Sequence, residues 1–226
     1  LALVDAAIRG GRLVQAQTML DLLPDAKSDT FEVAVLRAQL MLAQGQYVEA
    51  ERAFGKLAAT PSQDCRVVAG LGSASAALRH TEAALARLQD ATTRCPADWR
   101  LWADLGHAYD SGARWNESKA AYERASALNA PRASLLNDMA VSLLMQHRYP
   151  EARALLQQAL AADPDDRRVA NNLDIAAASM GEAPVRRRGE DAARWAERLS
   201  NAGYAASLAG RSDDARAWLT QSIAAA

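Results

Sequence analysis

A spacing of about 34 residues recurs along the chain and constrains its fold more than any other feature. Frames of this length begin at Phe31, Cys65, Trp99, Ala133 and Arg167, and a partial frame precedes the first. Each full frame up to residue 166 holds two apolar helical stretches separated by a turn. A single helical hairpin that is apolar on two faces cannot bury both, whereas stacked hairpins bury a continuous core. The spacing therefore predicts an all-α solenoid.

The third full frame carries the most specific motif. Trp102, Leu105, Gly106 and Tyr109 form the pattern W-x2-L-G-x2-Y, and Ala125 follows in the second helical stretch. This is the signature of the tetratricopeptide repeat, a helix–turn–helix unit. The chain thus resembles tetratricopeptide-repeat proteins, and we expect a right-handed superhelical solenoid of such hairpins.

The same columns of residues recur in the other frames. The small residues that let the second helix approach the first are Ala16, Ala50, Ala84, Ser118 and Ala152. The large residues four positions later are Leu20, Phe54, Leu88, Tyr122 and Leu156. A single match can arise by chance, but matches that keep one register along the chain indicate a true repeat.

These columns divide the chain into repeats of one predicted solenoid over 1–226. The division is a partial repeat 1–30, repeats 31–64, 65–98, 99–132 and 133–166, an irregular repeat 167–195 and a C-terminal capping unit 196–226. The register breaks before Ala196, which begins its frame early for the period. Residues 182–191 lack the second-helix pattern, so we expect a loop or a short irregular helix there.

Composition and motifs exclude several classes of function. The net charge of −1 provides no global field to hold nucleic acid. No apolar run reaches the length of a membrane span, and no signal peptide is visible. The chain begins at Leu1 rather than Met, so we expect a processed or trimmed product that has lost any upstream targeting segment. Phosphate-binding loops, H-E-x-x-H and a Ser–His–Asp constellation are missing from the sequence, which predicts a non-catalytic protein without cofactor or metal.

The resemblance implies a partner-binding groove, because the first helix of each tetratricopeptide repeat lines the inner surface of the stack. The candidate groove residues are Arg66, Arg100, His107, Asp110, Asn137, Val141, Leu144, Arg168, Asn171 and Ile175. An amide both donates and accepts hydrogen bonds, so the two asparagines are candidates for gripping a peptide main chain. The arginines are candidates for meeting an acidic segment. Simple solvation is the alternative for any one of these residues.

His107 lies between Asp104 and Asp110 at helical spacing. Steps of three residues place these side chains on neighbouring parts of one helix face. Because the sequence offers no ligand from a second helix, we interpret His107 as a hydrogen-bonded surface histidine rather than a metal ligand.

The two cysteines lie in one repeat. Cys65 opens its first helix and Cys95 ends its second. Because the helices of a hairpin are antiparallel, the two thiols meet at one end, where a disulfide is geometrically feasible. A disulfide would favour the periplasm or the exterior, where such bonds persist. Two unrelated buried thiols are the alternative.

The last third of the chain narrows the resemblance. It contains Asn171-Asn172-Leu173, an interruption rich in arginine with one proline, and then the run from Arg194 to Tyr204. These features resemble the TadD family, the tetratricopeptide lipoproteins of tight-adherence (Flp) pilus assembly. The resemblance implies an outer-membrane lipoprotein in the periplasm, attached only through a lipid outside this chain. Its implied role is that of a pilotin or scaffold whose partner is the pilus secretin or another assembly component.

Two other classes of function remain open. One is a recognition domain of a larger enzyme, such as a glycosyltransferase, or of a polysaccharide-export machine. The other is a cytoplasmic adaptor. Each of the three functions requires a protein partner, and the sequence leaves the oligomeric state open.

Overall fold

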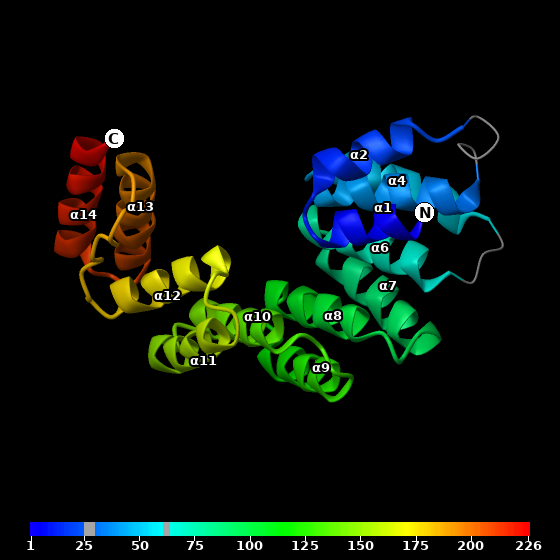
Figure 1. Cartoon of the computed structure of the whole chain (residues 1–226). Coiled ribbons are helices and arrows are strands. Elements are labelled where there is room, and N and C mark those ends of the chain that lie inside the picture. The colour runs from blue at the N-terminus through cyan, green and yellow to red at the C-terminus, as the bar shows by residue number, and fades with distance from the viewer. Residues whose placement is uncertain (25–29, 61–63) are drawn as a thin grey trace. The chain divides into compact units, whose positions relative to one another are not determined.

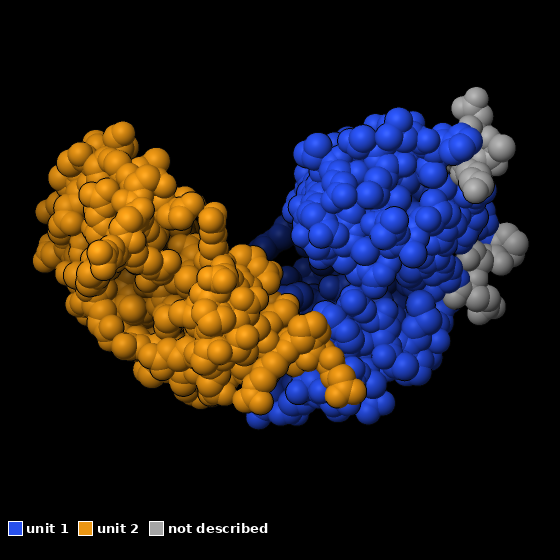
Figure 2. All heavy atoms as spheres, viewed as in Figure 1, with its two compact units in different colours: residues 1–128 blue, residues 129–226 orange. Residues whose placement is uncertain are grey.

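The computed structural model describes residues 1–24, 30–60 and 64–226. Over these residues the chain forms thirteen helices and no strand (Figure 1). The helices belong to two compact units, Leu1–Leu128 and Asn129–Ala226 (Figure 2). The predicted all-α fold class is therefore confirmed. None of the described helices is both long enough and apolar enough to cross a membrane.

The first unit is a series of helices in which neighbours along the chain pack together. Its helices are α1 (Ala2–Arg9), α2 (Leu13–Asp21), α4 (Phe31–Ala43), α5 (Tyr47–Ala58), α6 (Cys65–Ala77), α7 (Thr81–Arg94), α8 (Trp99–Ser111) and α9 (Trp115–Ala127).

The second unit is also a series of helices in which neighbours along the chain pack together. Its helices are α10 (Arg132–Met145), α11 (Tyr149–Ala162), α12 (Arg167–Ser179), α13 (Ala192–Leu208) and α14 (Ser212–Ala225).

The starts of the first helices follow from local capping. Helices α4, α6, α8 and α12 begin at the residues where the repeat frames begin, and α10 begins one residue earlier. The side chains of Asp64, Asp98 and Asp166 each accept a hydrogen bond from the backbone N–H two residues later. Such a bond satisfies an amide that has no partner within its own helix. Thr30 caps α4 in the same way through the amide of Val33.

Within the hairpins, a large side chain of the second helix lies on a glycine of the first. A Cβ atom added to Gly106 would lie 2.5 Å from the ring of Tyr122, and one added to Gly72 would lie 2.8 Å from Leu88. The glycines therefore allow the two helices to approach closely. This contact explains the column of large residues to which Leu88 and Tyr122 belong.

A disulfide closes one of these hairpins. It joins Cys65, the first residue of α6, to Cys95, which follows α7, with the two Cα atoms 6.2 Å apart. The antiparallel packing of α6 and α7 brings these two ends together.

The C-terminal part departs from the predicted unit 196–226. Helix α12 is followed by the non-helical residues 182–191 rather than by a second helix. Helix α13 starts four residues earlier than predicted, at Ala192, because the side chain of Asp191 accepts a hydrogen bond from the backbone N–H of Arg194 at 2.8 Å and caps the helix there.

Charged side chains hold the non-helical segment against the helices around it. The guanidinium of Arg198 on α13 donates to the carboxylates of Asp174 on α12 and Glu190 in the segment, at 2.7 and 2.9 Å. The same guanidinium donates to the carbonyl oxygen of Val185. Arg198 is almost fully buried, so these acceptors compensate a buried charge. In this repeat, the hydrogen bonds and ion pairs of Arg198 thus take the place of the apolar contacts that a second helix would make.

The close helix contacts lead to a matched pair of expectations. A Cβ atom at Gly70 of α6 would overlap the ring of Phe54, which is fully buried, whereas one at Gly55 of α5 would meet nothing. We expect Gly70→Ala to lower the free energy of unfolding by about 1–3 kcal/mol through overpacking. We expect Gly55→Ala to raise it by up to about 1 kcal/mol, because alanine is the better helix former. Urea denaturation measures both, and a Gly70→Ala protein as stable as the parent would contradict the packing described.

Candidate protein-interaction surface

The first helices carry all the candidate groove residues. Helices α6 and α8 carry those of the first unit, and α10 and α12 carry those of the second. We call the side chains on these helices and on α4 that are at least partly accessible the first-helix surface, and each unit is described by itself.

Arg66 is held between two helices rather than extended toward a partner. Its guanidinium lies 2.6 Å from a carboxylate oxygen of Glu32 on α4 and 2.6 Å from one of Asp64. The hydrogen bond from Arg66 lowers the pKa of Glu32. Partial burial opposes the same shift at Asp64, but the hydrogen bonds from Arg66 outweigh it and lower the pKa of that carboxyl too. These bonds also raise the pKa of Arg66, so all three groups remain charged at neutral pH.

The other two candidate arginines, Arg100 and Arg168, are also paired with nearby aspartates. Arg100 lies 3.6 Å from Asp98, and Arg168 lies 3.4 Å from Asp166. In each case the partner is the aspartate that caps the same helix. The spacing Asp-x-Arg therefore places an ion pair at the start of each of these helices. The three arginines thus have a structural role that the sequence alone did not indicate. Of the three arginines, Arg168 is the most exposed.

His107 and Asp110 are joined through a residue of the next helix. The hydroxyl of Tyr122 on α9 donates to a carboxylate oxygen of Asp110 at 2.8 Å, and its oxygen lies 3.1 Å from Nδ1 of His107. Because Tyr122 has only one hydroxyl proton, we assign Nδ1 of His107 as the donor in that second bond. Asp110 is only 4% exposed, so its prediction as a groove residue is wrong. His107 is exposed and keeps its place on the first-helix surface.

His107 and Asp104 were weighed in the sequence as metal ligands, and their surroundings bear on that alternative. Among the described residues, no group of three or more histidine, cysteine, aspartate or glutamate side chains could hold a metal ion. Asp104, which the sequence places one turn before His107, accepts a hydrogen bond from Ser73 on α6 at 3.2 Å. This bond links two neighbouring first helices.

The two candidate asparagines connect helices in the second unit. The Oδ1 atom of Asn137 accepts a hydrogen bond from Nδ2 of Asn172 at 2.8 Å, and that of Asn171 accepts one from Nδ2 of Asn201 at 3.4 Å. Asn137 is 4% exposed, so it cannot grip a peptide main chain without repacking. The adjacent residues Asn171 and Asn172 can be seen in the sequence, but only the structure shows which residues they bond to.

The accessible first-helix surface of the second unit includes apolar side chains beside Arg168 and Asn171. Val141 and Leu144 on α10 and Ile175 on α12 are each partly exposed. Met145 follows on α10 and is 47% exposed, although the sequence analysis did not single it out. Residues three and four positions apart lie on one helix face, so Val141, Leu144 and Met145 form a short apolar strip. The exposed part of this strip provides apolar contact area for a partner with apolar side chains.

Comparisons with known proteins agree with this architecture. The family model of the tetratricopeptide repeat matches residues 133–166. No curated protein matches the chain. The chain is similar to the crystal structure of TTC0263, a thermophilic tetratricopeptide-repeat protein of Thermus thermophilus, with a TM-score of 0.69 and 22% identity over 78% of this chain and 96% of that one.

Two further solved structures share the fold. A tetratricopeptide-repeat protein from Parabacteroides merdae is 13% identical, with a TM-score of 0.61 over 99% of this chain and 90% of that one. YrrB, described as a tetratricopeptide-repeat protein with an unusual peptide-binding site, is 17% identical, with a TM-score of 0.50 over 77% of this chain and 93% of that one.

The chain therefore has the fold of tetratricopeptide-repeat proteins. Residues 133–166 form one such repeat by sequence as well as by structure. Both findings support the resemblance drawn from the Trp102 motif.

The amide bridges lead to a measurable expectation. Replacing Asn137 by alanine leaves the Nδ2 group of the partly buried Asn172 without its acceptor. We expect Asn137→Ala to lower the free energy of unfolding by about 1–3 kcal/mol. Asn171→Ala is the control, because its bond is longer and its side chain more exposed, and we expect a smaller loss. Thermal and urea denaturation measure both, and an Asn137→Ala protein as stable as the parent would contradict a stabilising role of the bridge to Asn172.

Proposed function

We propose that this protein is a non-catalytic scaffold that binds other proteins through its first-helix surface. The observation that carries the proposal is the apolar strip of Val141, Leu144 and Met145. It lies in the repeat at 133–166 that matches the family model. An apolar strip on an otherwise hydrogen-bonded helical face suits an amphipathic helix or an extended peptide with apolar side chains.

The polar contacts of the first unit support an apolar rather than an acidic partner. Arg66 and Arg100 are both paired with carboxylates of this chain. An acidic segment would have to compete with these carboxylates, whereas an apolar segment on α10 displaces only water.

The disulfide supports an oxidising compartment for the proposed scaffold. A bond between Cys65 and Cys95 persists in the periplasm or outside the cell, but is rare in the cytoplasm. Together with the resemblance of the run from Arg194 to Tyr204 to the TadD family, it supports a role in assembly of a tight-adherence (Flp) pilus. In this proposal the protein serves as pilotin or assembly factor for the secretin and is held at the outer membrane by a lipid outside this chain.

Thiol trapping tests the compartment. Cells that express the native protein are treated with a membrane-permeant alkylating reagent before lysis, and peptides are analysed without reduction. We expect Cys65 and Cys95 to be recovered as one linked peptide pair. Recovery of both as alkylated peptides would favour the cytoplasmic adaptor and remove the periplasmic part of the proposal.

Photocrosslinking tests the surface and the partner together. A photoreactive amino acid at Met145 is compared with one at Gln157, which is exposed on the second helix α11 of the same repeat. We expect adducts from Met145 but not from Gln157, and a secretin or another pilus component in the adduct. Adducts of equal yield at both positions would argue against the first-helix surface. A cytosolic protein in the Met145 adduct would replace the pilus role with an adaptor role.

A further inference from the structure

The disulfide of the first unit joins two helix ends of opposite polarity. Cys65 is the first residue of α6, and Cys95 directly follows the last residue of α7. The free amides at a helix N-terminus favour a negative charge, whereas the free carbonyl groups at a helix C-terminus disfavour it. A thiolate is therefore more stable at Cys65 than at Cys95.

The charged side chains around these helix ends are paired with one another. Asp64 and Arg66 flank Cys65 in the chain, and the guanidinium of Arg66 lies 2.6 Å from a carboxylate oxygen of Asp64. In the last turn of α7, Arg94 lies 2.8 Å from a carboxylate oxygen of Asp90. Since both pairs are neutral as a whole, the two helix ends determine the difference between the cysteines.

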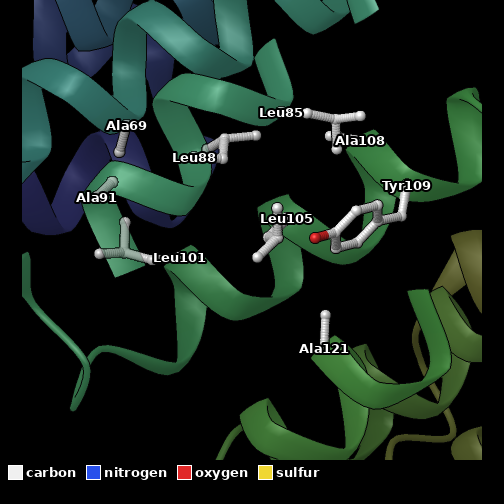
Figure 3. Close-up of a cluster of buried hydrophobic side chains, with 9 residues drawn as sticks. All are labelled: Ala69, Leu85, Leu88, Ala91, Leu101, Leu105, Ala108, Tyr109 and Ala121. Carbon is white, nitrogen blue, oxygen red and sulfur yellow. The ribbon is translucent and has the colours of Figure 1, made fainter. Parts of the chain in front are cut away.

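The disulfide is within reach of a reagent in solution and fixes one end of a connection between repeats. Both cysteines are partly exposed, and they pack at the edge of the buried cluster that α6 to α9 form (Figure 3). Residues 95–98 connect α7 to α8. The indole Nε1 of Trp102 on α8 donates to the carbonyl oxygen of Pro96 in this connection at 2.9 Å. The disulfide thus holds the start of the connection, and Trp102 holds its middle.

We propose that this disulfide is a thiol-exchange site, at which an incoming thiolate bonds to the sulfur of Cys95 and releases Cys65 as a thiolate. The more stable thiolate is the better leaving group, so attack at Cys95 is faster than attack at Cys65. The bond between the two cysteines breaks, a new S–S bond forms between Cys95 and the incoming sulfur, and the electron pair of the broken bond stays on Cys65.

A reductant with two thiols completes the reaction. Its second thiolate attacks its own first sulfur in the mixed disulfide and releases Cys95 as a thiolate, which takes up a proton. The reductant is thereby oxidised to a disulfide, and Cys65 and Cys95 are both reduced. The chemical class of the co-reactant is therefore a dithiol, and a single thiol stops at the mixed disulfide on Cys95.

Reduction removes the covalent link without removing the packing of the hairpin. Leu88 of α7 still lies against Gly72 of α6, so the two helices remain together. The loss of order is confined to the connection 95–98 and the first turn of α6, where the disulfide was attached. The site thus regulates, by oxidation state, how firmly two neighbouring repeats are joined.

Trapping with glutathione, a single thiol, tests the direction of exchange. The oxidised protein is mixed with excess reduced glutathione and quenched after short times with N-ethylmaleimide, and its peptides are analysed by mass spectrometry without reduction. We expect glutathione on Cys95 with maleimide on Cys65, in about threefold or greater excess over the opposite pairing. Equal amounts of the two pairings, an excess of glutathione on Cys65, or no adduct at either cysteine would overturn the proposal.

A pair of variants tests the electrostatic cause. Asp64→Asn keeps a capping side chain at the start of α6 but removes a negative charge beside Cys65, so we expect the ratio of Cys95 to Cys65 adducts to rise about twofold or more. Asp166→Asn is the matched control, because it changes the equivalent cap of α12 in the second unit, and we expect the parent ratio. A loosened hairpin would raise both adducts together, so an unchanged ratio in Asp64→Asn would contradict the cause given.

Hydrogen exchange with and without dithiothreitol, a small dithiol, tests the effect on the connection. We expect faster exchange after reduction at the amide of Asp98, which bonds to the carbonyl oxygen of Cys95, and in the first turn of α6. The central amides of α7 should keep their protection. The double variant Cys65→Ser, Cys95→Ser is the control and should not respond to dithiothreitol. Unchanged exchange of the connection in the reduced protein would remove the regulatory role.

Discussion

The close approach of two helices at a small residue is the contact on which the rest of the structure depends. Glycine at 72, 106 and 203 leaves room for a leucine or tyrosine of the following helix. The large side chain then reaches the next first helix, as Leu88 reaches Leu101 and Leu105. One small and one large position thus join the helices of a hairpin and join one hairpin to the next. Alanine can supply much of the core because backbone proximity, rather than side-chain size, brings the surfaces together.

Polar groups on the first helices mainly hold the stack together. Arg66 bridges α4 and α6, Ser73 and Asp104 link α6 to α8, and Asn137 links α10 to α12. Each buried polar atom that gains a partner in this way avoids the cost of desolvation without compensation. What is left for recognition is a smaller surface than the groove predicted from the sequence, and in the second unit that surface is apolar around Met145. The apolar strip of α10 is thus the part of the chain that we propose for a partner protein.

The segment 182–191 interrupts a repeat and is held against the helices around it by charged side chains. Arg198 donates hydrogen bonds to Asp174, Glu190 and a backbone carbonyl at the place where a second helix would have supplied apolar side chains. Two side-chain hydrogen bonds between α12 and α13, Asn171 with Asn201 and Asp174 with Arg198, run in opposite order along the helices. Helix α13 therefore crosses α12 in the opposite direction, as the missing second helix would have done, and then forms its own hairpin with α14.

The sequence by itself determined the helical repeat, the positions of most first helices and the proximity of Cys65 to Cys95. These features depend on short-range rules, namely apolar period, capping aspartates and the antiparallel geometry of a hairpin, which can be read along the chain. Tertiary structure alone decided that Asp110 and Asn137 are buried, and that α13 begins at Ala192. Those outcomes depend on side chains from neighbouring helices, such as Tyr122 and Asn172, and on which of several capping residues the packed chain uses. A repeat frame assigns a position to each residue, but only the packed neighbours determine whether that position faces solvent, a partner or another helix.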